Sequence, residues 1–450
     1  MNNWHEIDPM WAWEPFSPPG GKLTREHVAH LHRRTCLGAT ISQIEMGTQR
    51  SVTELVDELI RPLPEANSTD PLAQATLATG NARKLSAWWV YRLLTTDAPC
   101  REVMTLFWHG HFATSADKVT NVNLMYRQNE LLREYAFEDF GKLVQEISHD
   151  SAMLIYLDSV TNRKAHPNEN YAREVMELFC LGEGNYTETD IRELARCFTG
   201  WEVRREKFRF NRYQHDSGEK TVFGKTGPWT GEQGVDIVLE QAALPRFLVS
   251  KLIHYFLADE VDIPEKLIEP LAKQLRDDGL QIGPTLKRLL SSNLFFSKSC
   301  VAAKVRSPVT FAIGLLRSLE GTADTIALAE GVGDLGQDLF FPPNVKGWDG
   351  GRAWINSSTL LARANLIRRL LDHENTRFAK GSLAELASSL DRRTGTDVIN
   401  WWEATLLATP LRSDVREQLV STIENGSGNR DARLRDALHL FCALPEYQLA

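Results

Sequence analysis

The 450-residue chain has only six cysteines, and no two of them form a Cys-x-x-Cys pair. Cysteines scattered in this way do not match a zinc-binding pattern and are typical of small buried side chains in a reducing compartment. The sequence also lacks a basic, apolar leader at its start and any run approaching the roughly 20 apolar residues of a membrane helix. These absences predict a cytoplasmic protein that does not enter a membrane.

An excess of basic residues is missing as well. The formal charge is −8 and the pI is near 5.9, whereas a nucleic-acid-binding protein needs a broad positive surface to displace counterions from phosphates. We therefore expect no nucleic-acid partner. Hydrophobic residues make up 42% and charged residues 24% of the chain, which is the composition of an ordinary globular protein.

Helical periodicity dominates the sequence, and we predict a mainly α-helical fold. A chain of this length forms either one large helical domain or two subdomains packed together. We expect a Trp- and Pro-rich strap over residues 1–22, a helical core over 23–366, and further helices packed on the core over 367–450. The prolines of the strap predict an extended, non-helical segment with buried indoles.

One strongly patterned helix is expected between Asn168 and Gly182. An apolar stripe predicts the face that packs on the core, with Asn168 as the cap and Gly182 in the left-handed conformation that ends the helix. The opposite stripe is polar and contains Arg173, Glu174 and Glu177. The helix thus combines a buried face with a charged one.

Residues 201–234 differ from the rest because polar and apolar residues alternate there. The alternation over 207–213, followed by a turn-like stretch and a second strand over 220–224, predicts a single β-hairpin. A lone two-stranded ribbon is marginally stable, so we expect it to pack on the helical body. Its turn carries His215, Asp216 and Lys220; either it reaches a functional surface or it is an ordinary polar loop tip.

Two histidines, His109 and His111, flank Gly110 after an aromatic stretch. On a continuous helix their side chains would point about 200° apart and could not bind one ion, so they converge only if Gly110 interrupts the helix. A His-x-His pair is a metal-binding signal. The alternative is a pair of histidines hydrogen-bonded within an aromatic core.

A loop over residues 337–361 combines prolines and glycines with aromatic residues. The prolines and glycines oppose regular structure while the aromatic residues favour burial, so the pattern predicts an ordered loop pressed against the body. Ordered long loops are more often functional than simple connections.

Four motifs in this chain resemble the successive signatures of the bacterial domain-of-unknown-function family 1800 (DUF1800). They are Phe107–Phe112, Asn168–Glu174, His215–Lys220 and Pro342–Trp348. The similarity extends over nearly the whole chain, and it implies one large, mostly helical unit. It also implies a neighbouring partner of the alkaline-phosphatase/sulfatase-like kind, and many family members appear to be exported. The family has no settled activity that the resemblance could carry over.

Two functional hypotheses follow. In the first, the protein is an enzyme for metal-dependent hydrolysis or transfer on an anionic substrate, with a divalent metal as its cofactor. The predicted metal ligands are His109, His111 and His215. The predicted catalytic residues are Glu174, Glu177, Arg173, Asp216, Lys118 and Lys220, in which carboxylates act as ligand or general base and cations stabilise the anion. Without a metal, the same carboxylates could perform acid–base chemistry.

In the second hypothesis, the protein is a non-catalytic helical scaffold that binds a protein partner. The charges around Arg173 are then only surface ion pairs worth a few tenths of a kcal/mol each, and the loop over 337–361 is the docking surface. The two hypotheses differ in one geometric requirement. An enzyme needs the histidines and carboxylates of separate segments to meet in one cleft.

Overall fold

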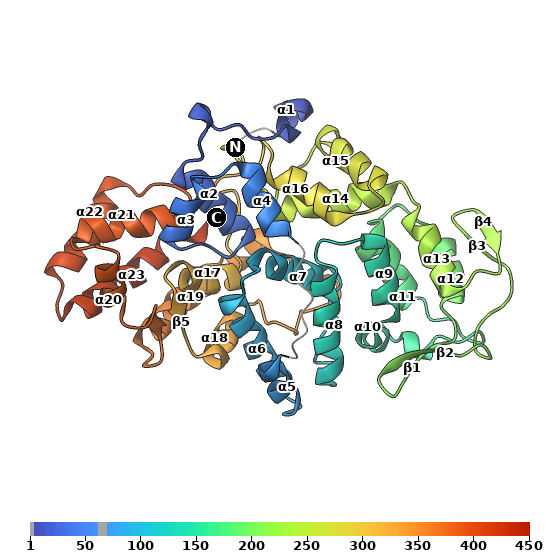
Figure 1. Ribbon diagram of the computed structural model, residues 1–450. Coiled ribbons are helices and arrows are strands. Elements are labelled where there is room, and N and C mark those ends of the chain that lie inside the picture. Colours follow the sequence, from blue (N-terminus) through green and yellow to red (C-terminus); the bar gives the residue numbers. More distant parts are fainter. Residues whose placement is uncertain (1–3, 62–69) are drawn as a thin grey trace.

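The computed structural model describes residues 4–61 and 70–450, and these form a mainly α-helical protein, as the periodicity predicts (Figure 1). Within the described residues, the β-structure is limited to three two-stranded sheets. No helix among them has the length and apolar character needed to cross a membrane.

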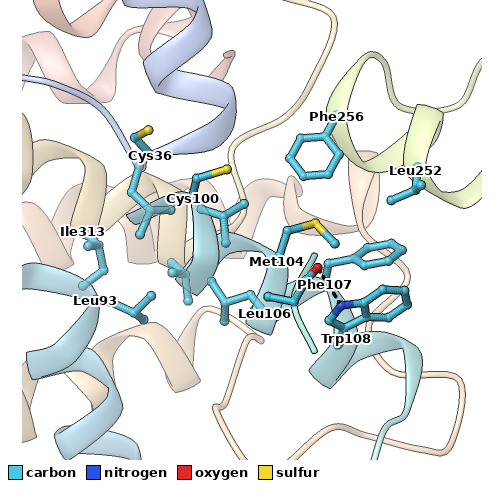
Figure 2. Packing of buried hydrophobic residues seen from close by; sticks show 14 of the residues in the cluster. Cys36, Leu93, Cys100, Met104, Leu106, Phe107, Trp108, Leu252, Phe256 and Ile313 are labelled. Atoms are coloured by element: carbon cyan, nitrogen blue, oxygen red, sulfur yellow. Dashed lines mark hydrogen bonds between the residues drawn. The ribbon is translucent and has the colours of Figure 1, made fainter. Parts of the chain in front are cut away.

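Helix α7 (Pro99–His111) lies at the centre of the fold, and nearly all of its residues are buried. Figure 2 shows its side chains Met104, Leu106 and Phe107 among residues of other helices. The surrounding helices include α6 (Ala82–Thr95), α14 (Ala243–Phe256) and α17 (Pro308–Ser318). Because aromatic and aliphatic residues occur on every side of α7, it is buried all round rather than amphipathic.

The other helices of the first half are short to medium in length, and most begin at a Ser, Thr, Asp or Asn cap. They are α1 (Pro9–Trp13), α2 (Arg25–Thr35), α3 (Ile41–Gly47), α4 (Val52–Ile60), α5 (Pro71–Leu77), α8 (Val122–Glu134), α9 (Phe140–His149), α10 (Ser151–Tyr156), α11 (Asn170–Glu174) and α12 (Glu188–Cys197).

The second half continues in the same manner. Its helices are α13 (Gly231–Leu239), α15 (Glu265–Asp277), α16 (Ile282–Leu290), α18 (Thr325–Asp334), α19 (Ser357–Asp372), α20 (Leu383–Ser389), α21 (Gly395–Leu406), α22 (Ser413–Asn425), α23 (Arg430–Ala443) and α24 (Pro445–Gln448). Helix α21 contacts α2, α3 and α17, and α23 contacts α19, so the C-terminal helices pack against the rest of the protein. In Figure 1 they lie at the end opposite β1–β4.

The N-terminal segment is not the extended strap that its prolines predict. It forms a 3₁₀ turn at Trp4–Glu6 and the helix α1, because Pro9 occupies the first position of α1, where no backbone N–H is needed. Trp4 and Trp13 are buried as expected, whereas Trp11 is 43% exposed. The backbone then pairs with the segment around Ser292.

The patterned helix between Asn168 and Gly182 forms, but its geometry changes part-way. An α-helical turn, α11, continues directly into the π-helix η4 (Val175–Cys180). Asn168 accepts a hydrogen bond from the backbone N–H of Asn170, and Gly182 adopts the expected positive φ of 81°. The predicted apolar stripe is buried or packed against the core.

The region 201–234 contains two hairpins instead of the single one predicted. Strand β1 (Trp201–Arg204) pairs with β2 (Lys207–Phe210), and β3 (Lys220–Val222) pairs with β4 (Lys225–Gly227). The predicted pairing of 207–213 with 220–224 is therefore wrong. Each hairpin closes through a two-residue turn with positive φ at both positions, which lets strands pair with their nearest neighbours in sequence. A third sheet joins β5 (Gly321–Thr322) to β6 (Arg377–Phe378).

The loop over 337–361 is ordered and lies directly on the end of α7. Phe340 accepts a backbone hydrogen bond from Ala116 at 2.8 Å. Gly347 has a φ of 78°, and a Cβ atom there would overlap the carbonyl oxygen of Gly110. The two glycines therefore allow the loop and the helix to approach backbone to backbone.

Candidate functional site

His109 holds the ordered loop in place. Its Nε2 accepts a hydrogen bond from the backbone N–H of Phe340 at 3.2 Å, and its ring lies among those of Trp89, Phe340 and Trp348. Burial lowers the pKa of His109 to about 3, so the ring is neutral at pH 7. Its surroundings are those of a hydrogen-bonded core histidine.

His111 faces a different environment because α7 continues through Gly110 without a break. Its Nε2 lies 2.9 Å from the carbonyl oxygen of Phe179. A carbonyl can only accept, so Nε2 carries the hydrogen and Nδ1 keeps its lone pair. Nδ1 is buried and has no hydrogen-bond partner. Burial, reinforced by the nearby charge of Lys251, holds the pKa of His111 well below its usual value.

The predicted residues of the hairpin region are bound to neighbouring groups. His215 Nδ1 lies 2.9 Å from the carbonyl oxygen of Thr199. Asp216 accepts a hydrogen bond from Arg196 Nε at 2.7 Å, and although burial opposes it, this interaction lowers the pKa of Asp216. The buried Lys220 donates to the carbonyl oxygen of Trp229 at 2.9 Å. Asp216 therefore holds the segment between the hairpins on α12, while the other two side chains are bound to backbone carbonyls nearby.

The candidates on the patterned helix and Lys118 are also paired. Arg173 donates to both carboxylate oxygens of Glu188 at 2.8 Å. Glu177 accepts from the Tyr186 hydroxyl at 2.6 Å. Lys118 forms an exposed ion pair with Asp158 at 2.8 Å.

Glu174 is half-buried on the polar face of the patterned helix. Burial, followed by the neighbouring charge of Glu177, raises its pKa. The protonated, uncharged form of Glu174 is therefore favoured relative to that of an exposed glutamate.

The structure does not bring the nine predicted site residues together. The described part of the chain contains no group of three or more His, Cys, Asp or Glu side chains placed to hold a metal ion. Of the nine residues, only His111 lines the cleft described next.

This cleft has a volume of about 500 Å³, within the range of small-molecule sites. Its wall combines aromatic side chains, several basic residues and the ordered loop. The residues that carry the argument below are Arg33, Arg34, Phe107, His111, Lys251, Tyr255, Asp259, Lys304, Trp348 and Trp354. They come from α2, α7, α14, the segment around 304 and the loop over 337–361, so distant parts of the chain build one cavity.

Arg33 is the most unusual group in this wall. It is only 7% exposed, and its Nε and Nη1 are buried without a hydrogen-bond partner. Burial, with help from the charges of Arg306 and Arg34, lowers the pKa of Arg33 to about 9, which leaves the guanidinium charged at pH 7. An unpaired buried charge costs several kcal/mol. The fold therefore carries a cation that no described protein group neutralises.

Lys251 is a second cation in the cleft without an ion-pair partner. Its Nζ lies 4.9 Å from the centre of the Phe247 ring, and burial lowers the pKa of Lys251 to about 8. The buried indole N–H of Trp348 likewise has no acceptor. Together with Arg33, these groups supply unused donors, and His111 Nδ1 supplies an unused acceptor.

Several other charged residues of the cleft have partners. Lys304 forms an ion pair with Asp259 and donates to the carbonyl oxygen of His254 at 2.8 Å. Arg34 donates to the carbonyl oxygens of Phe256 and Cys300. Glu260 forms an ion pair with Arg352 at 3.0 Å. The unpaired groups are therefore a distinct subset, and their net charge is positive.

The family model for DUF1800, described as a protein of unknown function, matches residues 30–449. The chain belongs to the DUF1800 family. The match includes the four motifs and every cleft residue named above. Comparison of this DUF1800 protein with curated proteins and with solved structures gave no match.

Sequence reasoning missed Arg33 and Lys251 because neither lies in a pattern with a known chemical role. The available signals were weak. Arg33 and Arg34 are adjacent cations in the last turn of α2, where the helix dipole favours positive charge. The ordered loop was the better indicator, since Trp348 and Trp354 from this loop line the cleft of the DUF1800 protein.

Proposed function

We propose that this DUF1800 protein is an enzyme that binds a small organic anion in the cleft lined by Arg33, His111, Lys251 and Trp348. The single observation that supports the proposal best is the buried guanidinium of Arg33, which has unused donors and no protein counter-ion. A carboxylate or phosphate bound in the cleft would neutralise this charge.

The other residues of the wall indicate which further chemical groups the ligand contains. Phe107, Tyr255 and Trp354 provide apolar and aromatic surface, which suits an organic rather than a purely inorganic anion. His111 Nδ1 accepts a hydrogen bond from a ligand hydroxyl or amine. Titratable groups with shifted pKa values in a concave site support a catalytic role for the cleft.

This proposal keeps one part of the sequence-based hypothesis and changes another. The substrate is still anionic, and hydrolysis or transfer stays the proposed reaction class. The groups that contact the anion, however, come from α2, α7 and α14 instead of the hairpin region and the patterned helix. His111 is the residue common to both versions.

Citrate titration against a KCl control of equal ionic strength tests the proposal. We expect citrate to raise the melting temperature of the wild-type protein, because a ligand that binds only the folded state stabilises it in proportion to RT ln(1 + [L]/Kd). Isothermal titration gives the affinity directly. We expect Arg33→Met to weaken binding at least about tenfold, as loss of a charge-assisted hydrogen bond does.

Arg352→Met is the matched control, because Arg352 is an exposed arginine near the same cleft that is already paired with Glu260. Its citrate affinity should stay within about twofold of wild type, as expected for a rim charge. Equal melting temperatures in citrate and KCl for the wild type, with no heat of binding, would contradict the anion site.

A second candidate function is favoured by two exposed leucines. Leu360 and Leu361, on the helix α19 that follows the ordered loop, are 41% and 65% exposed. A scaffold would use this apolar surface to bind an alkaline-phosphatase/sulfatase-like partner. Titration of that purified partner tests it: Leu361→Asp should lower the affinity at least about tenfold if the surface is a binding hot spot, and no measurable binding to the wild type would reject it.

A further inference from the structure

Lys251 differs from Lys304, another lysine of the cleft, in having no carboxylate partner among the described residues. Its Nζ contacts the ring of Phe247, and it lines the cleft beside Phe107, His111 and Tyr255. None of the ion pairs within residues 4–61 and 70–450 includes Lys251. Burial disfavours the ammonium form, and the cation–π contact with Phe247 offsets this only in part, so the uncharged form is favoured relative to that of a surface lysine.

An uncharged lysine amine is a nucleophile toward carbonyl carbon. In water at pH 7, an ordinary lysine is almost fully protonated and reacts slowly. For a group with a pKa of about 8, the uncharged fraction at pH 7 is roughly 200-fold larger than for one at the usual lysine value of about 10.4. The site also places the unpaired cation Arg33 in the same cavity.

We propose that Lys251 forms an imine with a small carbonyl compound that carries an anionic group, such as a 2-oxo acid, bound in the cleft. The inference that this compound carries an anionic group rests on the function proposed above, whereas the inference that Lys251 forms an imine does not. Arg33 binds the anionic group, and the carbonyl carbon lies against Lys251.

The step is balanced without an oxidant or a reductant. The Nζ lone pair attacks the carbonyl carbon and forms a C–N bond, and the carbonyl π electrons move to oxygen. The amine then loses its two hydrogens to that oxygen by way of solvent, the C–O bond breaks, and one water molecule leaves. The product is a neutral imine, which gains a proton when the medium is acidic enough.

Reductive trapping on the full-length wild-type protein tests the proposal. The protein is incubated at pH 7 with glyoxylate and cyanoborohydride, which supplies the hydride that converts the imine to a stable secondary amine. Peptide mass spectrometry then measures the modification rate of each lysine. We expect Lys251 to be modified at least about tenfold faster than Lys304 or Lys273, since its larger uncharged fraction is partly offset by restricted access.

The chain provides two internal controls. Lys304 lines the same cleft but is paired with Asp259, and Lys273 is a surface lysine whose side chain is 76% exposed. A preference for Lys251 over both excludes simple accessibility as the cause. The parallel reaction with acetaldehyde, which has no anionic group, separates the amine chemistry from anion binding.

The outcomes distinguish the two proposals. Preferential modification of Lys251 by both reagents, with the glyoxylate rate alone reduced in Arg33→Met, supports the imine and the anion site. Preference with acetaldehyde but not with glyoxylate supports the imine and overturns the anion site. Modification of Lys251 no faster than Lys273 with either reagent overturns the imine, whatever the citrate titration shows.

Discussion

The cleft and the hairpin end, here residues 196–229, both gather charged side chains but differ in how these charges are neutralised. At the hairpin end, Arg196 bonds to Asp216 at 2.7 Å and to Glu193 at 2.8 Å, and Lys220 has a carbonyl partner. In the cleft, Arg33 and Lys251 have no such partners. Unsatisfied polar groups therefore distinguish the cleft from the hairpin end, where neighbouring protein groups satisfy the charged side chains.

The largest expected effect concerns the glycine contact that forms one wall of the cleft. Gly347→Ala should destabilise the protein by about 3 kcal/mol, because the new Cβ overlaps the backbone of Gly110 and the positive φ disfavours alanine. Urea unfolding measures the change. Gly20→Ala is the control: its φ is also positive, at 77°, but nothing lies within 4 Å of the new Cβ.

Gly20→Ala should therefore cost only about 1 kcal/mol, which is the cost of the left-handed backbone conformation alone. Similar losses for the two variants would show that close packing of the loop on α7 contributes little. The hairpin end should be unaffected in either variant, and hydrogen exchange of its backbone amides tests that independence.

The next prediction is that replacing two buried arginines by methionine changes the free energy of unfolding in opposite directions. Arg363 donates to Gln448 at 3.2 Å and to the carbonyl oxygen of Arg306 at 2.7 Å. Arg363→Met should destabilise the protein by about 2 kcal/mol, because it leaves buried acceptors unpaired. Arg33→Met should instead stabilise it by about 1 kcal/mol in an anion-free buffer, because it removes an unpaired buried charge.

Urea unfolding of both variants and of the wild type in the same buffer provides the measurement. Destabilisation by Arg33→Met of the same size as by Arg363→Met would mean that Arg33 has a structural partner, and the contrast between the two regions would lose its basis.

A smaller, pH-dependent effect is expected at the hairpin end. Asp216→Asn should destabilise the protein by about 1–2 kcal/mol at pH 7, through loss of the charge-assisted bond with Arg196. The folded-state pKa of Asp216 is lowered, so its contribution is complete above the unfolded value near 4 and is lost as the pH falls through the folded value. Unfolding curves between pH 7 and 3 should show the two proteins converging only below about pH 4.

A stability difference that persists undiminished at pH 3 would mean that the ionised form of Asp216 is not what holds the hairpin on α12.

The smallest effect is expected at Arg173. This arginine is partly exposed and pairs with Glu188 and Glu169, and surface ion pairs contribute little. Arg173→Ala should change the free energy of unfolding by no more than about 0.5 kcal/mol and leave citrate binding unchanged. A loss of citrate affinity would place the anion near the patterned helix and contradict the cleft.

The main outlines of the fold could be predicted from sequence because helical periodicity, caps and glycine ends are local signals. The strands were harder. The turn of β1 and β2 consists of Arg205 and Glu206, both with positive φ. Asn-Gly or Asp-Gly usually marks such a turn, so this hairpin had no recognisable sequence signature, and the alternation from Lys207 onward suggested a later partner.

The candidate site depended even more on tertiary structure. Residue type alone shows that Asp216 and Arg33 are charged. Whether each has a partner depends on segments far away in the chain, as with Arg196 on α12 for Asp216. Sequence motifs therefore identified the polar turns at the hairpin end. The absence of partners for Arg33 and Lys251 could be recognised only from the three-dimensional structure.

The π-helix η4 has a consequence for the length of this segment. Such a wide turn corresponds to one residue more than an α-helix needs for the same path. Deleting a single residue between Val175 and Cys180 would restore ordinary winding and rotate the carbonyl of Phe179 away from His111. The tautomer of His111, and with it the nitrogen that carries the lone pair, thus depends on the extra residue of η4. None of the cleft cations lies on this helix.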